Sequence, residues 1–322
     1  MFNDKKSKIL GNLNSNYIVA PAGLVILFIF FAITAPSFFS VINIMNVLKQ
    51  ASVTLTVSVA MLMVIVTGGI DLSVGAILGL TGCLTGFFHH NAGMNIWAAM
   101  VTGLVIASLL GLVNGILIAK GGVPPFIATL GLMSVCRGTA LMLTQGNPFK
   151  GFPDDYRVLG RGLVGPFPVI FLVAFVVLLI VAFVMYYTEV GRNLYAVGGN
   201  ETTARYSGIK VDKIKIIAYT SSGLICGIAS ILLTTRINSA PPMGGSGIEL
   251  DAIAACVIGG ASLAGGEGSV WGALLGAMVM TVLANGLSIL NVNSFAQQTI
   301  IGVVLIGTVF LRSFNEKRKA NT

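Results

Sequence analysis

Charge is the property that this sequence has least of. Only 9% of its 322 residues are Asp, Glu, Lys or Arg, whereas soluble globular domains carry about 25%. With 55% hydrophobic residues and a mean hydropathy of +0.92, the chain has too few charged side chains to cover a water-facing surface. The composition therefore excludes a soluble globular fold and indicates a polytopic membrane protein.

Residues that carry common enzyme chemistry are also scarce. The chain has two histidines, and its four cysteines stand far apart in apolar runs, as is typical of buried free thiols. It contains no G-x-x-x-x-G-K-[ST] loop and therefore no nucleotide site of that kind. Neither a metal-ligand cluster nor a paired-carboxylate site is apparent. We expect no cofactor, no metal and no enzyme activity in this chain.

Long apolar runs fill most of the sequence. A helix needs about 20 residues to cross a hydrocarbon core of about 30 Å. Windows of that kind predict an all-α fold with about ten transmembrane helices, in one transmembrane domain over residues 1–322. The windows are 17–36, 51–67, 72–88, 96–118, 125–144, 167–187, 216–235, 250–263, 270–290 and 296–311. The window 250–263 is too short to cross alone, so it borrows from its Gly-rich flank or is a broken helix.

Basic residues are distributed unevenly between the two sides of the expected membrane. Positive residues near span ends stay in the cytoplasm, and a cytoplasmic N-terminus puts most of the 19 Lys and Arg residues on that side. We therefore expect a multi-pass membrane protein with both termini and the loop 188–215 in the cytoplasm. The net charge of +8 then reflects topology, and no nucleic-acid partner is expected.

Two pairs of segments resemble each other. The stretch 69–76, GIDLSVGA, resembles 249–255, ELDAIAA, and 113–117 resembles 284–288. In the ten-span topology the members of each pair run in opposite directions. This predicts an inverted repeat of spans two to five and seven to ten, an arrangement that is common in transporters.

Glycine, with 40 residues, is abundant and ordered. Gly75, Gly79, Gly82 and Gly86 line one face of the third expected span. Gly111 with Gly115, and Gly272 with Gly276, have the small-xxx-small spacing. Such faces let helix backbones approach closely in lipid, so they predict tight helix packing.

Few ionisable residues lie inside the expected spans. Charges in hydrocarbon are costly and mark pathways or partners; Arg137 lies well within a span, and Asp71 and Asp251 stand at span starts. We expect these three, with Asn114 and Asn285, to shape or gate a solute path. For each of them a structural role, as a cap or an interhelical hydrogen bond, remains open. Without a relay of ionisable groups, the path suits a neutral hydrogen-bonding solute.

The loop 188–215 is the most informative polar segment. Gly198 and Gly199 interrupt the chain, Asn200 is a good N-cap, and Gly208 is placed as a C-terminal stop. The pattern predicts a two-turn helix from Glu201 to Ser207 at the cytoplasmic surface. A short, polar helix with such clear limits favours docking of a soluble partner.

Four motifs, in this order, resemble those of bacterial ribose-type sugar permeases. They are GGIDLSVGA (68–76), GGVPPFIATLG (121–131) with Arg137-Gly138, GRNLYAVGGNETTARYSGI (191–209) and GIELDAIAACVIGGASLAGGEGS (247–269). These permeases are the membrane subunits of ATP-binding-cassette importers for monosaccharides. The resemblance covers roughly residues 20–312 and leaves the particular sugar open.

The resemblance implies a neutral monosaccharide as solute and several partner proteins. These are a second permease, identical or related, a periplasmic or extracellular sugar-binding protein, and a cytoplasmic ATPase that hydrolyses ATP. Gly191–Ile209 would insert a coupling helix into the ATPase. Gly198, Gly199, Asn200, Glu201, Ala204 and Gly208 match the family pattern, and Gly191, Arg192 and Arg205 complete the expected coupling set. Thr202 and Thr203 replace residues that are often Ala, which leaves the exact contacts open.

Two other classes of function remain as alternatives. An ion-driven secondary carrier of a small neutral solute would need no ATPase, and the missing carboxylates in the middle of the membrane argue against it. A membrane-embedded enzyme would need acids or histidines clustered at one membrane face, whereas Asp71 and Asp251 fall on opposite faces in the expected topology.

Overall fold

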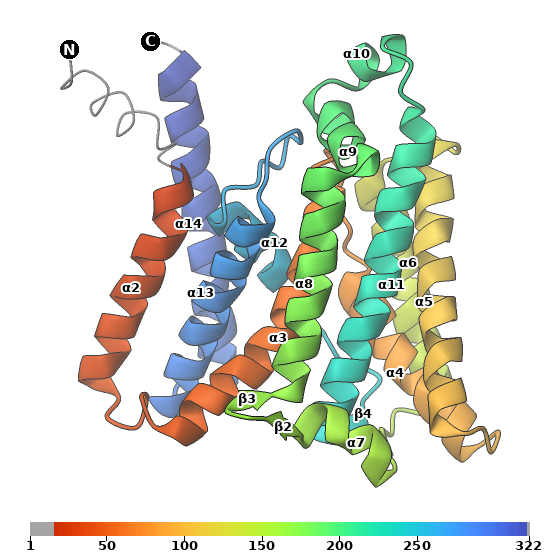
Figure 1. Cartoon of the computed structure of the whole chain (residues 1–322), viewed down its shortest axis with the longest axis vertical. Coiled ribbons are helices and arrows are strands. Elements are labelled where there is room, and N and C mark those ends of the chain that lie inside the picture. The colour runs from red at the N-terminus through yellow and green to blue at the C-terminus, as the bar shows by residue number, and fades with distance from the viewer. Residues whose placement is uncertain (1–15, 321–322) are drawn as a thin grey trace.

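The chain folds as a bundle of long helices. The computed structural model describes the backbone of residues 16–320, and the helices of the bundle run side by side (Figure 1). The long helices are α2 (Asn16–Thr34), α3 (Val41–Ile65), α4 (Val74–His90), α5 (Ile96–Ala119), α6 (Pro125–Thr144), α8 (Val169–Tyr187), α11 (Val211–Ile237), α13 (Val270–Ile289) and α14 (Ser294–Ala320). The short ones are α7 (Asp154–Arg161), α9 (Glu189–Gly199), α10 (Glu201–Tyr206) and α12 (Ile248–Ile258). The all-α class expected from the sequence is correct.

The two ends of the bundle carry different short elements. α9 and α10 lie at one end, where α2 begins and α14 ends, and α7 lies at the other (Figure 1). We call these the α10 end and the α7 end. At the α7 end β1 (Phe149–Lys150) pairs antiparallel with β4 (Ser239–Ala240), and β2 (Leu163–Val164) pairs with β3 (Phe167–Pro168). The β1–β4 pair ties the chain after α6 to the chain after α11.

The expectation of about ten transmembrane helices is wrong. In the described part of the chain, six helices are long and apolar enough to cross a membrane, namely α3, α5, α6, α8, α11 and α13. α4 has 17 residues and α12 has 11, and the window 250–263 includes chain after α12 that is not helical. Residues 69–73 before α4 and 259–269 after α12 form turns and irregular segments.

The windows 17–36 and 296–311 do not raise the number of spans to the expected ten. The described apolar part of α2, Ala20–Thr34, is shorter than a span. The window 296–311 falls in α14, several of whose side chains lie outside the described residues. A hydropathy window measures apolar composition and not the path of the backbone, so apolar Gly-rich turns were counted as helix. The prediction of an inverted repeat assumed ten alternating spans, so it is wrong as well.

The starts of the helices follow from residues that satisfy the first backbone N–H groups. Ser40 accepts a hydrogen bond from the amide of Asn43 at the start of α3, and Ser269 does the same for Gly272 at the start of α13. α6 begins at Pro125, directly after Pro124, where proline lacks an N–H that the first turn would leave unpaired in any case.

Burial shows which helices form the centre of the bundle. In α3, 78% of the most apolar stretch is buried within the chain, against 28% in α5 and in α6. α3 packs against α8, α11, α12 and α13. α5 and α6 therefore present much of their apolar surface outward, as helices in contact with lipid or with another membrane subunit do.

The predicted glycine faces are confirmed as sites of close packing. A Cβ atom at Gly79 would lie 2.7 Å from the Gly244 carbonyl oxygen and 2.8 Å from Nη1 of Arg137. A Cβ atom at Gly111 would overlap the backbone of α11, and one at Gly276 would overlap the backbone of α12. These glycines let neighbouring chain segments approach to backbone contact.

Replacing Gly223 with alanine is expected to destabilise the bundle. Its Cβ atom would overlap the carbonyl oxygen of Ala107 and press on Gly111, where α5 and α11 meet. Overpacking of this kind costs about 1–3 kcal/mol, more than the roughly 1 kcal/mol that alanine gains over glycine in helix propensity. The thermal unfolding midpoint in detergent should therefore fall. Gly23→Ala is the matched control, because nothing lies within 4 Å of its Cβ position; equal midpoints for both variants would contradict the packing argument.

Candidate functional site

A buried polar cluster lies where the chain turns between α3 and α4. The side chain of Asp71 is fully buried, and one carboxylate oxygen accepts hydrogen bonds from the Ser73 amide, at 3.0 Å, and from the Ser73 hydroxyl. The other oxygen accepts from the hydroxyl of Ser222 in α11 at 3.0 Å. Asn114 of α5 donates its side-chain amide to the Ser73 hydroxyl at 2.9 Å. Asp71, Ser73, Asn114 and Ser222, the Asp71 cluster, therefore connect the α3–α4 turn to α5 and α11.

The Asp71 cluster includes a polar atom that the chain leaves unpaired. Oδ1 of Asn114 is buried and has no hydrogen-bond partner among the described residues. Buried polar atoms normally have partners, so this oxygen is available to a water molecule or a hydroxyl group of a solute. Two of the predicted path residues, Asp71 and Asn114, are thus brought together, although they stand far apart in the sequence.

A cavity lies between the α3–α4 turn and α10. Its volume is about 350 Å³, and its wall includes Gly69 and Tyr219 as well as Glu201 and Lys215. The Tyr219 hydroxyl donates to the carbonyl oxygen of Ile70, next to Asp71, at 3.4 Å. The cavity therefore borders both the α3–α4 turn and the residues that hold α10.

Arg137 belongs to a second polar group. Its Nη1 donates to the carbonyl oxygens of Gly244, at 2.8 Å, and of Pro242, at 3.2 Å. These carbonyls belong to residues 241–247, the non-helical chain before α12. Arg137 also interacts electrostatically with Glu249, which accepts a hydrogen bond from the amide of Gly247. Arg137 thus fixes residues 241–247 against α6 by charge-assisted hydrogen bonds.

The two remaining predicted path residues lie in different surroundings. Asp251 is in the first turn of α12 and is half-buried. Asn285 of α13 forms a reciprocal amide pair with Asn43 of α3, with N–O distances of 3.0 and 3.1 Å. The pair holds α13 against the start of α3, and the hydrogen bonds of Asn285 do not reach the Asp71 cluster or Arg137. A gating role for Asp251 and Asn285 stays a prediction.

The loop 188–215 folds much as its sequence predicts. The helix expected over Glu201–Ser207 is α10, Glu201–Tyr206. The Asn200 side chain caps it by accepting from the amide of Thr203 at 2.8 Å, and Gly208 follows with a φ of +84°, a backbone conformation that favours glycine.

Ion pairs attach α10 to α11. Glu201 accepts from Lys215 at 2.6 Å and from Arg205 at 3.4 Å, and Arg205 also donates to Asp212 at 3.0 Å. The hydrogen bond from Lys215 is the main reason why the pKa of the Glu201 carboxyl is lowered. The Tyr206 side chain, in contrast, is 89% exposed. α10 is therefore held on one side and open on the other.

The other predicted coupling residues have distinct positions. Gly198 packs so closely that a Cβ atom would overlap the carbonyl oxygen of Val66 at the end of α3, and Gly191 packs on the carbonyls of Val184 and Met185. Ala204 is the buried residue on the inner side of α10. Arg192 and Gly199 are exposed.

Acidification is expected to loosen α10. Because the pKa of Glu201 is lowered in the folded state, its ion pair stabilises the attachment above the ordinary Glu pKa of about 4.3 and loses this contribution as the pH falls through the lowered value. Amide hydrogen exchange of 201–206, corrected for intrinsic rates, should show constant protection between about pH 5 and 8 and less in stronger acid. Glu201→Gln should reduce this dependence, while the Arg205–Asp212 ion pair remains; an unchanged profile in that variant would contradict the role of the Glu201 carboxylate.

Several residues of these groups were not singled out from the sequence. Ser222 and Tyr219 complete the surroundings of Asp71, Asn43 pairs with Asn285, and Lys215 holds Glu201. The only local signal for Ser222 is its place in the short polar run 220–222 within an apolar helix. Asn43 and Lys215 carry no such signal, because their partners are recognised only in three dimensions.

Comparison with known proteins identifies the family. Residues 43–309 match the family described as branched-chain amino acid transport system / permease component. The chain belongs to this permease family. It is therefore a transport subunit of a membrane importer and not an enzyme, as expected, and its helices are those of a multi-pass protein of the inner membrane.

Curated relatives cover nearly the whole chain. A ribose import permease of Bacillus subtilis (strain 168) is 44% identical over 294 residues, 90% of each chain. A ribose import permease of Escherichia coli (strain K12) is 40% identical over 304 residues, 92% of this chain and 94% of that one. A D-allose transport system permease of the same organism is 36% identical over 289 residues, 89% and 88% of the two chains. No solved structure shows significant similarity to this chain.

Proposed function

We propose that this permease moves a neutral monosaccharide of the ribose type into the cytoplasm, driven by a separate ATPase. The observation that carries the proposal is α10, a capped and ion-paired helix with an exposed Tyr206, beside the cavity that reaches the α3–α4 turn. The sugar class is supported by relatives named for ribose and D-allose at 36–44% identity, although the family description names branched-chain amino acids.

The chemistry of the Asp71 cluster supports a neutral solute. Its carboxylate already accepts hydrogen bonds from Ser73 and Ser222, so it offers little to a cation, whereas the Asn114 carbonyl oxygen has capacity left. Sugar hydroxyl groups donate such hydrogen bonds. Asp71, Asn114 and Arg137, with Asp251 and Asn285, are the residues proposed to shape or gate the path.

ATP-driven transport would use α10 as the coupling helix. We assign the α10 end to the cytoplasm, together with the start of α2 and the end of α14 (Figure 1). Nucleotide binding in the ATPase would move α10, and the ion pairs of Glu201 and Arg205 would transmit this motion to α11 and to the cavity. A partner that binds two states unequally is what drives such a cycle.

A second permease is proposed to cover the face formed by α6 and residues 241–250. Non-helical backbone at membrane depth is tolerated only when protein covers it or when it lines a water-filled cavity. Residues 241–247 lie against the first two turns of α4 and the middle of α6, yet Met243 is 52% exposed and Met142 of α6 is 80% exposed. A periplasmic or extracellular binding protein would deliver the sugar at the α7 end.

Charge reversal in α10 tests the coupling. Glu201→Lys combined with Arg205→Glu would place like charges against Lys215 and Asp212 and so release α10 from α11. Uptake of labelled sugar and copurification of the ATPase should both fall while membrane insertion stays normal. Normal uptake would refute the docking assignment.

A competition panel with ribose, allose and leucine tests the solute: ribose should compete best, and competition by leucine alone would contradict the sugar class.

A further inference from the structure

A second cavity lies at the α10 end, between the end of α5 and the start of α11. Its volume is about 650 Å³, and its wall combines apolar side chains with basic ones. The apolar side chains include those of Ile209, Ile216 and Ile217, and the basic ones are Lys120, Lys210 and Lys213, beside Arg205. The transport cycle outlined above uses the Arg205–Asp212 ion pair in this wall and gives the three lysines no role.

The positive charge of the cavity is uncompensated. Asp212, the acid in its wall, is engaged by Arg205 at 3.0 Å. No ion pair of Lys120, Lys210 or Lys213 occurs within the described residues. The three neighbouring lysines therefore have no carboxylate partner among the described residues, and their positive charge can attract an anion.

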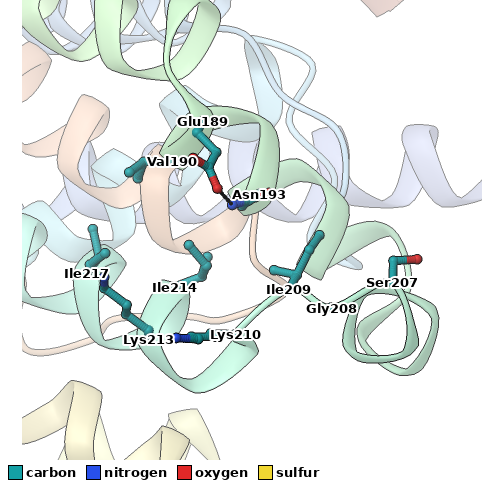
Figure 2. A pocket seen from close by; sticks show the side chains of 10 residues that line it. All are labelled: Glu189, Val190, Asn193, Ser207, Gly208, Ile209, Lys210, Lys213, Ile214 and Ile217. Atoms are coloured by element: carbon teal, nitrogen blue, oxygen red, sulfur yellow. Dashed lines mark hydrogen bonds between the residues drawn. The ribbon is translucent and has the colours of Figure 1, made fainter.

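Lys210 and Lys213 also line the adjacent cavity of about 460 Å³ on the α9 side. Their side chains lie next to each other there, and the carboxylate of Glu189 faces Asn193 (Figure 2). Glu189, the acid of that cavity, thus accepts its hydrogen bond from the side-chain amide of Asn193 and forms no ion pair with either lysine.

Apolar side chains are exposed near the end of α5, the helix that ends next to the cavity. Lys120 directly follows α5, so the cavity lies where two apolar helices, α5 and α11, have their ends. Within the last two turns of α5, Val113, Ile116 and Leu117 are 40–44% exposed. The groups that fit a basic rim above an apolar surface are a negative headgroup and acyl chains.

We propose that this cavity binds an anionic phospholipid. The three lysines would surround the phosphate, and the acyl chains would lie along Ile216 and the outer face of α5. Basic pockets between helices at the cytoplasmic surface recognise anionic headgroups in this way. The proposal requires that the chain spans a membrane and that the α10 end faces the cytoplasm, and it does not depend on the transported solute.

Lipid retention by the full-length permease tests the proposal. The protein is incubated in mixed phosphatidylglycerol and phosphatidylcholine vesicles and the lipids retained after extraction are measured by native mass spectrometry. Phosphatidylglycerol should be retained preferentially, and each lysine replaced by glutamine should weaken its binding by about fivefold. Lys150→Gln, an exposed lysine of β1 at the α7 end, should change nothing, and a triple Lys→Arg variant should keep the preference because it keeps the charge.

Three results would overturn the proposal. One is an unchanged preference for phosphatidylglycerol in the triple Lys→Gln variant, provided that its unfolding midpoint is unchanged. Another is displacement of the lipid by millimolar inorganic phosphate, which would identify a site for free phosphate. The third is loss of ATPase copurification in the triple variant with normal lipid retention, which would assign the lysines to a protein interface. Sugar uptake is measured separately, so failure of the lipid proposal and failure of the transport proposal can be told apart.

Discussion

Alanine in place of Asp71 is expected to abolish solute uptake. The change removes the acceptor for Ser73 and Ser222 and leaves these buried donors without their partner. A buried donor left unpaired costs about 1–3 kcal/mol, and the Asp71 cluster joins the α3–α4 turn to α5 and α11. Uptake of labelled ribose should therefore fall to background, with a lower unfolding midpoint. Asp155→Ala, at an exposed carboxylate of α7, is the control and should leave both quantities unchanged.

Asparagine at the same position separates two mechanisms. Asn keeps the shape and one acceptor oxygen, and serine hydroxyl groups can turn to accept from its amide. If Asp71 organises the path by hydrogen bonds, Asp71→Asn should retain uptake within about tenfold of wild type, a loss of about 1.4 kcal/mol or less. If Asp71 carries a proton, as in an ion-driven carrier, Asn should be as inactive as Ala. That second outcome would contradict the proposed neutral path.

Tyr206→Ala is expected to weaken assembly with the ATPase by about 30-fold. Tyrosine is enriched among the residues that dominate protein interfaces, and truncating such a residue costs about 2 kcal/mol or more. Tyr206 is 89% exposed, whereas Ala204 holds the inner side of α10. The variant should therefore fold normally and lose affinity for the ATPase, measured by titration of the purified subunits. Tyr187→Ala, at the end of α8 and 74% exposed, provides the control; equal losses in both variants would show that exposure alone, and not docking, explains the result.

Local signals explain why the loop 188–215 was predictable. Asn200 and Gly208 determine the ends of α10 through their own backbone and side-chain preferences. The prediction ended one residue beyond the structure, within the usual fraying of helix ends. The glycine faces were predictable for a similar reason, since their spacing is a property of one helix.

The number of spans was not predictable from hydropathy. The apolar window 250–263 covers the end of α12 and the start of the turn that follows it, and both parts are apolar and rich in small residues. Turns such as 259–269 are held in place by other chain segments; the amide of Gly266, for example, donates to the carbonyl oxygen of Val66. Such contacts arise only after the helices have packed.

The sequence indicates which residues belong to the site, but not which residues they contact. Asp71, Asn114, Arg137 and Asn285 stood out because polar side chains are rare in apolar runs. Their separation into the Asp71 cluster, the Arg137 group and the Asn43–Asn285 pair depends on contacts between distant segments. Ser222 lies 151 residues from Asp71, and no periodicity within one helix could reveal that contact.

Energy coupling in a reconstituted system tests the central claim most directly. The permease and its ATPase are placed in proteoliposomes with the sugar-binding protein and labelled ribose at the α7 end, and uptake is measured with and without ATP and with an uncoupler. The account predicts uptake that requires ATP and is unaffected by the uncoupler. Uptake that persists without ATP and collapses with the uncoupler would contradict it and identify an ion-driven carrier.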